Sequence, residues 1–206
     1  MTRIEKLLPP AQPGKPWTVA FAGGSLLRLP EGAVADFALY AGMELSDEAL
    51  ADLRELARRL SLRDKAVAML SRQQMSAGML QEKLAAKGAG EELAREISAW
   101  AEEIGLVNDR AYAAALVRHG QGKGWGLYKI RDELYRRRVP RAYWDDALST
   151  LADPDETIDR FLEEKLEDPL DRKQVKKVSD ALVRRGFSWS AVADGIQRAR
   201  SRALDR

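Results

Sequence analysis

The sequence predicts a mainly helical protein of three tandem three-helix repeats in an elongated array, preceded by a small segment that contains a β-hairpin. Three observations lead to this fold class. The 206 residues are 45% hydrophobic and 32% charged but only 7% aromatic, which favours small helices packed through Leu, Ala and Ile. Most prolines and a Gly-Gly pair lie near the N-terminus, and one apolar pattern recurs three times after residue 60.

The first 60 residues are expected to form the N-terminal segment. The expected elements are strands at 17–21 and 25–29, a helix over 31–41 and a further helix from 47 onward. Gly23 and Gly24 between the two apolar runs are typical of a hairpin turn, and Ile4 and Leu7 are candidates for a third strand. Ser46 is the expected N-cap of the second helix, because a serine hydroxyl can accept a hydrogen bond from a free N–H of the first turn.

The rest of the chain is expected to form repeat 1 (61–107), repeat 2 (108–152) and repeat 3 (153–206). The apolar residues Leu127, Ile130 and Leu134 return 48 residues later as Val175, Val178 and Leu182, and Ile130 and Leu134 are preceded by Leu80 and Leu84 at a distance of 50 residues. The expected helices are 62–73, 76–87 and 91–104, then 109–119, 126–138 and 141–151, then 154–167, 171–185 and 189–203. Glycines and prolines separate most of them.

The net charge of +2 conceals a segregation of charge along the chain. Residues 1–60 and 61–117 each carry 7 basic and 8 acidic side chains. Residues 118–141 carry 8 basic and 2 acidic ones, 142–171 carry 2 and 11, and 172–206 carry 10 and 3. Because salt screens charges over about 8 Å, these blocks act as separate surfaces. The acidic block is expected to be a solvated helix face or a counter-surface for the basic blocks.

The middle helices of repeats 2 and 3 are expected to present matched cations opposite their apolar stripes. On a helical wheel the outer positions are Lys129, Asp132 and Arg136 in repeat 2, Lys177, Asp180 and Arg184 in repeat 3, and Met79, Glu82 and Ala86 in repeat 1. A single cation on a helix face is most often only solvated. Two matched copies favour a patch for phosphate backbones or for an acidic protein surface.

A glycine-rich segment, residues 122–126, precedes the middle helix of repeat 2. It lacks Walker A spacing and a preceding strand, so a phosphate-binding P-loop is not expected. Lys123 beside Trp125 could combine charge with base stacking, but packing of Trp125 at the helix junction is the simpler interpretation. Tyr128 and Tyr135 flank the apolar stripe and are expected to be half-buried.

The residue types present exclude several kinds of site. The absence of cysteine excludes disulfides, Cys-ligated zinc and thiol catalysis, and the single histidine, His119, excludes sites that need two imidazoles. The carboxylates at 145–171 form a run without a paired base, a glycine loop or an aromatic pocket beside them, so no catalytic residue, metal site or cofactor is expected. No apolar run approaches the roughly 18 residues of a membrane span, and a signal peptide is not recognisable. A cytoplasmic protein that is not an enzyme and has no membrane partner is therefore expected.

The run from Gly105 to Leu134 resembles the RecX family of regulatory proteins. The family pattern stands here as Gly105-Leu106, Asp109, Tyr112-Ala113, Val117-Arg118, Lys123-Gly124-Trp125-Gly126 and Ile130-Arg131-Asp132-Glu133-Leu134. The resemblance covers essentially the whole chain, since the family has tandem three-helix units and its longer members carry a β-containing N-terminal extension. Leu127 replaces a common proline and Arg138 a common glycine, which concerns only the turn geometry of repeat 2.

The resemblance implies a bacterial, cytoplasmic, non-enzymatic modulator of the RecA recombinase. Such proteins bind in the groove of the RecA–ATP–single-stranded DNA filament, limit its extension, and so damp strand exchange and the self-cleavage of the SOS repressor. The implied partners are the RecA filament and the single-stranded DNA within it, bound by a monomer without a cofactor. The contact candidates in this chain are Arg118, Lys123, Trp125, Lys129, Arg131, Arg136, Arg137, Arg141, Lys173, Lys176, Lys177, Arg184 and Arg185.

Two other classes of function remain open from the residues alone. A free-standing nucleic-acid-binding protein would act through the basic repeats 2 and 3 without RecA, and would bind nucleic acid tightly with a steep dependence on salt. A helical scaffold would use the acidic block against a basic partner and would bind neither RecA nor nucleic acid.

Overall fold

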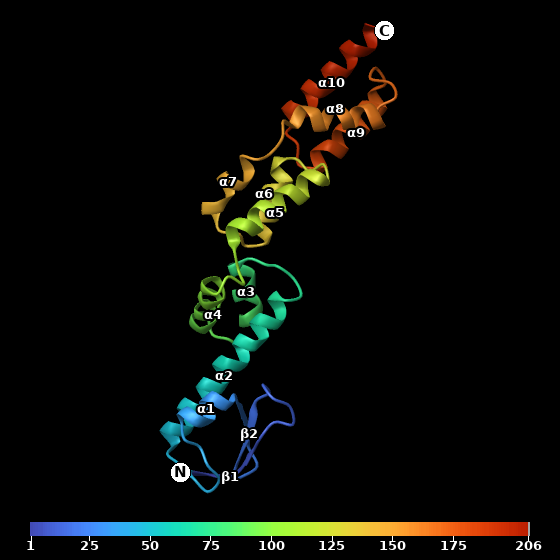
Figure 1. Ribbon diagram of the computed structural model, residues 1–206. Helices are drawn as coiled ribbons and strands as arrows, with labels where there is room; N and C mark the ends of the chain where they lie inside the picture. Colours follow the sequence, from blue (N-terminus) through green and yellow to red (C-terminus); the bar gives the residue numbers. More distant parts are fainter. Residues whose placement is uncertain (206) are drawn as a thin grey trace. The chain divides into compact units, whose positions relative to one another are not determined.

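The computed structural model describes residues 1–205 and is mainly helical with strands at its N-terminus, which confirms the prediction of a mainly helical fold preceded by a segment with a β-hairpin (Figure 1). The chain divides into two compact units, Met1–Met69 and Leu70–Arg206. Since the first holds the strands and the second all but two of the helices in the described residues, each is considered by itself.

The N-terminal unit contains an antiparallel sheet with the strand order β3-β2-β1-β4. Its strands are β1 (Thr2–Leu8), β2 (Trp17–Phe21), β3 (Leu26–Leu29) and β4 (Glu44–Leu45). The β2–β3 hairpin and the third strand are confirmed. Gly23 and Gly24 in the turn have φ of 95° and 84°, values that glycine adopts without strain. The short β4 was not expected, since two residues carry no periodic signal.

Two helices pack against this sheet, α1 (Glu31–Asp36) and the first part of α2 (Asp47–Leu70), as Figure 1 shows. Helix α1 is shorter than predicted because Ala38 takes a positive φ of 47°, which an α-helix cannot continue. Helix α2 is one helix where two were predicted, so the boundary drawn at residue 60 lies inside it. No glycine or proline interrupts the sequence between residues 47 and 70.

The second unit consists of helices. They are α3 (Ala77–Ala85), α4 (Glu91–Glu103), α5 (Asp109–Gly122), α6 (Leu127–Arg136), a 3₁₀ turn at Arg141–Tyr143, α7 (Trp144–Leu148), α8 (Pro154–Lys165), α9 (Arg172–Arg184) and α10 (Trp189–Leu204). Helix α3 packs on α4, helix α5 on α6 and α7, and α8, α9 and α10 pack on one another. Most of these helices agree with the predicted ranges, but α7 is shorter because a 3₁₀ turn replaces its beginning.

Repeats 2 and 3 each have a hydrophobic core around their middle helix, α6 or α9. Ile130 and Leu134 of α6 and the equivalent Val178 and Leu182 of α9 are all buried, as the 48-residue register predicts. Leu127, the first residue of α6, departs from the predicted stripe and is exposed.

Candidate nucleic-acid interface

The beginning of α6 meets the end of α9 at the junction between repeats 2 and 3. The backbone N–H of Gly126 donates to the carbonyl of Arg185 at 2.7 Å, and that of Tyr128 donates to the carbonyl of Gly186 at 3.0 Å. Gly126 and Gly186 bring the two backbones so close that a Cβ on either would overlap the other segment. This junction therefore fixes the position of repeat 3's middle helix relative to repeat 2.

The end of α6 meets the beginning of α3 in the same way, but through side chains. The Ser76 hydroxyl donates to the carbonyl of Arg137 at 2.5 Å, and the Arg138 guanidinium pairs with Glu82 at 2.8 Å. That ion pair raises the pKa of Arg138 and lowers the pKa of Glu82, chiefly through the hydrogen bond between them. Arg138 is thus committed to the junction between repeats 1 and 2.

Arg137, one of the predicted contact residues, is half-buried and also has partners within the protein. Its guanidinium donates to Glu133 at 2.6 Å and to the Tyr112 hydroxyl at 2.9 Å. The hydrogen bond to Tyr112, followed by that to Glu133, raises the pKa of Arg137 above its ordinary value. Since both contacts lie within repeat 2, this arginine positions α6 on α5.

The two cations of α6 that were predicted to face outward, Lys129 and Arg136, both have intramolecular partners. The Lys129 ammonium lies 4.7 Å from the centroid of the Trp125 ring, a cation–π contact that leaves Lys129 half-buried. The Arg136 guanidinium lies 3.7 Å from the carboxylate of Asp132. A ligand that binds α6 must compete with these contacts.

Most of the remaining predicted contact residues are exposed cations. Those that contact no carboxylate among residues 1–205 are Arg118, Lys123 and Arg131 in repeat 2 and Lys173, Lys176, Lys177 and Arg184 in repeat 3. Four of them lie on α9. Helix α9 is therefore the most basic surface without internal ion pairs in the described part of repeats 2 and 3.

The other three predicted residues lie against aromatic rings. Arg141 lies over Trp144 at 5.2 Å, and the half-buried Arg185 lies over Phe161 at 4.4 Å. Trp125 is partly buried and packs against the core of repeat 2, which agrees with the expected packing of this side chain at the helix junction.

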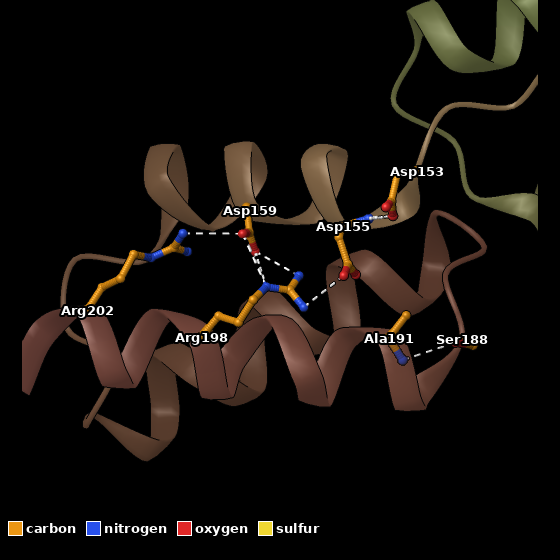
Figure 2. A network of polar contacts seen from close by, with 7 residues as sticks. All are labelled: Asp153, Asp155, Asp159, Ser188, Ala191, Arg198 and Arg202. Carbon is orange, nitrogen blue, oxygen red and sulfur yellow. Dashed lines mark hydrogen bonds and ion pairs between the residues drawn. The ribbon is translucent and has the colours of Figure 1, made fainter.

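The acidic block serves in part as a counter-surface inside repeat 3. Figure 2 shows Arg198 of α10 between Asp155 and Asp159 of α8, with guanidinium-to-carboxylate distances of 3.1 and 2.9 Å. Arg202 reaches Asp159 as well, at 3.2 Å. Burial raises the pKa of Asp159, but the hydrogen bonds and charges of both arginines outweigh it and leave the pKa below its ordinary value. These two arginines of the C-terminal basic block are thereby neutralised within the repeat.

Three residues of this surface were missed by sequence reasoning. Tyr128 and Tyr135 were expected to be half-buried, but their exposed fractions are 59% and 67%. They stand seven residues apart with Arg131 between them, so they share one side of α6, and this i, i+7 spacing was the available signal. Arg160 of α8 lines a cavity together with Lys123. It was missed because it lies in the acidic block, whose net charge is strongly negative.

Residues 1–205 contain no group of three His, Asp or Glu side chains that could hold a metal ion. The helices in this range include none that is both long and apolar enough to cross a membrane.

Comparison with known proteins places this helical arrangement in one family. A family model described as the second three-helix domain of RecX matches residues 108–148. A regulatory protein RecX of Chromohalobacter salexigens is 32% identical over 144 residues, which cover 66% of this chain and 91% of that protein. A regulatory protein RecX of Pseudomonas putida strain F1 is 36% identical over 90 residues, 43% of this chain, and the match spans only 57% of that relative's length.

Two solved structures share the fold. A crystal structure of a regulatory protein RecX covers 96% of this chain and 100% of its own, with a TM-score of 0.71 and 23% identity. A crystal structure of RecX from Lactobacillus salivarius covers 68% of this chain and 95% of its own, with a TM-score of 0.60 and 23% identity.

Proposed function

Because this chain belongs to the RecX family of regulatory proteins, we propose that it is a bacterial, cytoplasmic regulator of RecA in DNA recombination and repair. It binds the RecA–single-stranded DNA filament as a monomer and limits the extension of the filament. The recombinase and coprotease activities of RecA fall as a result. The chain itself makes and breaks no bond and needs no cofactor.

The observation that carries this proposal is the set of exposed cations on α9. Lys173, Lys176, Lys177 and Arg184 contact no carboxylate in the described residues, so they can meet phosphates without breaking an internal ion pair. Phosphate contacts dominate the affinity for nucleic acid. Several such contacts on one helix, together with those of repeat 2, add up to strong binding through individually weak units.

The test is a titration into RecA-catalysed ATP hydrolysis on single-stranded DNA. One variant replaces Lys173, Lys176, Lys177 and Arg184 by Glu. A matched control replaces the exposed cations Lys6, Lys15, Arg28 and Arg72 by Glu and so has the same net charge. We expect the natural chain and the control to inhibit hydrolysis and the α9 variant to lose most of this inhibition. No inhibition by the natural chain rejects the function, and full inhibition by a folded α9 variant rejects this surface.

A second function, nucleic-acid binding without RecA, is favoured by the exposed pair Tyr128 and Tyr135. Tyrosine rings beside Arg131 can stack on unpaired bases. Binding to naked single-stranded DNA at physiological salt that equals binding to the filament supports this function over the first.

A further inference from the structure

Two adjacent cavities lie at the junction between repeats 2 and 3. A basic cavity of about 280 Å³ lies between the α5–α6 loop, α8 and the end of α9. A mostly apolar cavity of about 490 Å³ lies beside it, between the beginning of α6, α7 and the beginning of α8. Both cavities are lined by Gln121, Thr157, Arg160 and Phe187, so one ligand can occupy the two. The volumes are those of sites for small molecules.

The basic cavity brings together three cations and one carboxylate. Lys123 and Arg160 enter it from two sides, and Arg185 enters from the end of α9. None of the three forms an ion pair with another residue between 1 and 205, and Glu164 is the acidic residue of the lining. An excess of two positive charges in a concave site attracts anions. The Arg185 guanidinium lies 4.4 Å from the centroid of the Phe161 ring, a contact that leaves its positive charge without a carboxylate partner among residues 1–205.

The side chains, not the glycine-rich backbone, would contact this anion. The N–H of Lys123 already donates to the carbonyls of His119 and Gly120, and that of Gly124 donates to Gln121. The segment therefore does not act as a P-loop, in agreement with its sequence. Guanidinium groups such as those of Arg160 and Arg185 can each bind a phosphate through two parallel hydrogen bonds.

The apolar cavity offers a surface for a flat ring. Trp125, Leu148 and Leu151 contribute to its walls. Asp153 also lines it, but its carboxylate accepts the N–H of Asp155 at 2.9 Å as the cap of α8. Aromatic side chains beside a positively charged groove are the usual means of holding a base and its phosphate without sequence preference.

We propose that this junction is a nucleotide-binding site, with the phosphate in the basic cavity and the base in the apolar one. This rests on the proposed function, because the RecA filament presents nucleotide phosphates in two forms. One is a nucleotide unit of single-stranded DNA, and the other is a free nucleoside triphosphate such as ATP. Both forms offer the same chemistry to Lys123, Arg160 and Arg185.

The test measures tryptophan fluorescence of the full chain, without RecA, during titration with a short oligodeoxythymidylate, with ATP or with inorganic phosphate. We expect a change in emission with a nucleotide that Trp125→Phe removes. Arg160→Ala should weaken binding about tenfold or more, because it removes a charge-assisted hydrogen bond. Arg72→Ala, which changes an exposed cation that lines neither cavity and lies outside repeats 2 and 3, is the matched control and should bind like the natural chain.

Each outcome decides the proposal. Where binding depends on Arg160, tighter binding of the oligonucleotide than of ATP identifies the strand as the source, the reverse order identifies the free nucleotide, and either supports the site. Equal affinity for inorganic phosphate and nucleotides overturns it, because the base is then not bound. Unchanged binding by Arg160→Ala also overturns it.

The same samples separate this site from the proposed function. If the natural chain inhibits RecA but binds none of the three probes, the proposed site is rejected and the proposed function stands. If it binds nucleotides through Arg160 but leaves RecA-catalysed hydrolysis unchanged, the site stands and the function is rejected.

Discussion

The two junctions between repeats use equivalent positions of the chain and different chemistry. Ser76 and Gly126 are equivalent, 50 residues apart, and Arg137 and Arg185 are equivalent, 48 residues apart. At the first junction a serine hydroxyl reaches the carbonyl of Arg137, and at the second the N–H of Gly126 reaches the carbonyl of Arg185. The first junction thus depends on a side-chain hydroxyl, and the second on hydrogen bonds between backbone groups.

Each junction has a glycine that allows close packing, but it lies in the segment at the start of the helix at the first junction and after the end of the helix at the second. At the first, Gly78 faces Arg138, and a Cβ on Gly78 would lie 2.8 Å from the Cβ of Arg138. At the second, the equivalent positions are Tyr128 and Gly186. The first junction is filled by polar side chains that bind one another. The second is made by backbone atoms, so its cationic side chains line a cavity instead.

The largest effect is expected from Gly186→Ala. The new Cβ would overlap the backbone of Lys129, and the φ of 89° is strained for alanine. We expect a loss of about 2–5 kcal/mol in the free energy of unfolding by urea denaturation. Gly32→Ala, in an open position of α1, is the control and should change little. Equal stability of the two variants would show that close backbone contact does not hold the second junction.

At the first junction the corresponding test is Asp109→Ala. The Asp109 carboxylate is buried and accepts the N–H of Ala77 at the start of α3 at 2.9 Å. Its loss leaves a buried N–H unsatisfied, so we expect a cost of about 1–3 kcal/mol. Asp109→Asn keeps an acceptor and should cost less. An equal cost for both variants would show that the hydrogen bond to Ala77 is not what stabilises this junction.

The pH dependence of stability gives Asp109 a second test. Burial raises the pKa of Asp109, and the hydrogen bond from Ala77 only partly offsets this. The folded chain therefore holds the proton more tightly than the unfolded chain, so stability falls as the pH rises from the ordinary Asp range through the raised pKa. Asp109→Asn should remove this fall. An unchanged slope would contradict the burial of a charge at this junction.

Inside repeat 3 the pKa of an aspartate is shifted in the opposite direction, so the effect of pH on stability is also opposite. The arginines of α10 leave the pKa of Asp159 below its ordinary value, so its contribution to stability is lost as the pH falls through the ordinary Asp range. Asp159→Asn should lower stability by about 1 kcal/mol at neutral pH, since the pair is only partly buried, and should flatten the acid limb of the curve. If the variant's stability still falls with decreasing pH as steeply as that of the natural chain, Asp159 is not the group responsible for the loss of stability in acid.

The smallest effect is expected from Arg138→Gly. Arg138 has a φ of 50°, the left-handed conformation that glycine adopts at the equivalent position 186. Glycine relieves the strain of this conformation and removes an ion pair with Glu82 that is exposed and screened by solvent. We expect little change in the free energy of unfolding and a weaker dependence of stability on salt. A large loss would mean that the ion pair holds the first junction.

The helical fold was predictable because its signal is local. The 48-residue register placed Val178 and Leu182 in the core, since apolar spacing alone decides which side of a helix is buried. The end of α1 was not predictable, because it depends on a positive φ at Ala38, and alanine is not a residue type that signals this conformation in a sequence. The continuity of α2 was readable in principle from its lack of glycine and proline.

The candidate interface was predictable in part. The contact of Arg136 with Asp132, four residues apart within α6, could have been anticipated from the helix geometry, whereas Trp125 precedes the helix and its contact with Lys129 could not. The ion pair of Arg198 with Asp155 joins residues 43 positions apart, so only the folded structure shows that it forms. Local charge counts could not separate free cations from paired ones for the same reason.

The central claim is that nucleic acid binds the cations of repeats 2 and 3 that have no internal partner. The direct measurement compares Lys177→Glu/Arg184→Glu on α9 with Lys129→Glu/Arg136→Glu at the equivalent positions of α6, as full-length folded chains. Binding of labelled single-stranded DNA is followed by fluorescence anisotropy at about 50 and about 200 mM salt. We expect the α9 pair to weaken binding and to flatten the salt slope by about 0.7 for each lost contact, and the α6 pair to change it less. A larger effect from the α6 pair, or none from the α9 pair, would contradict the claim.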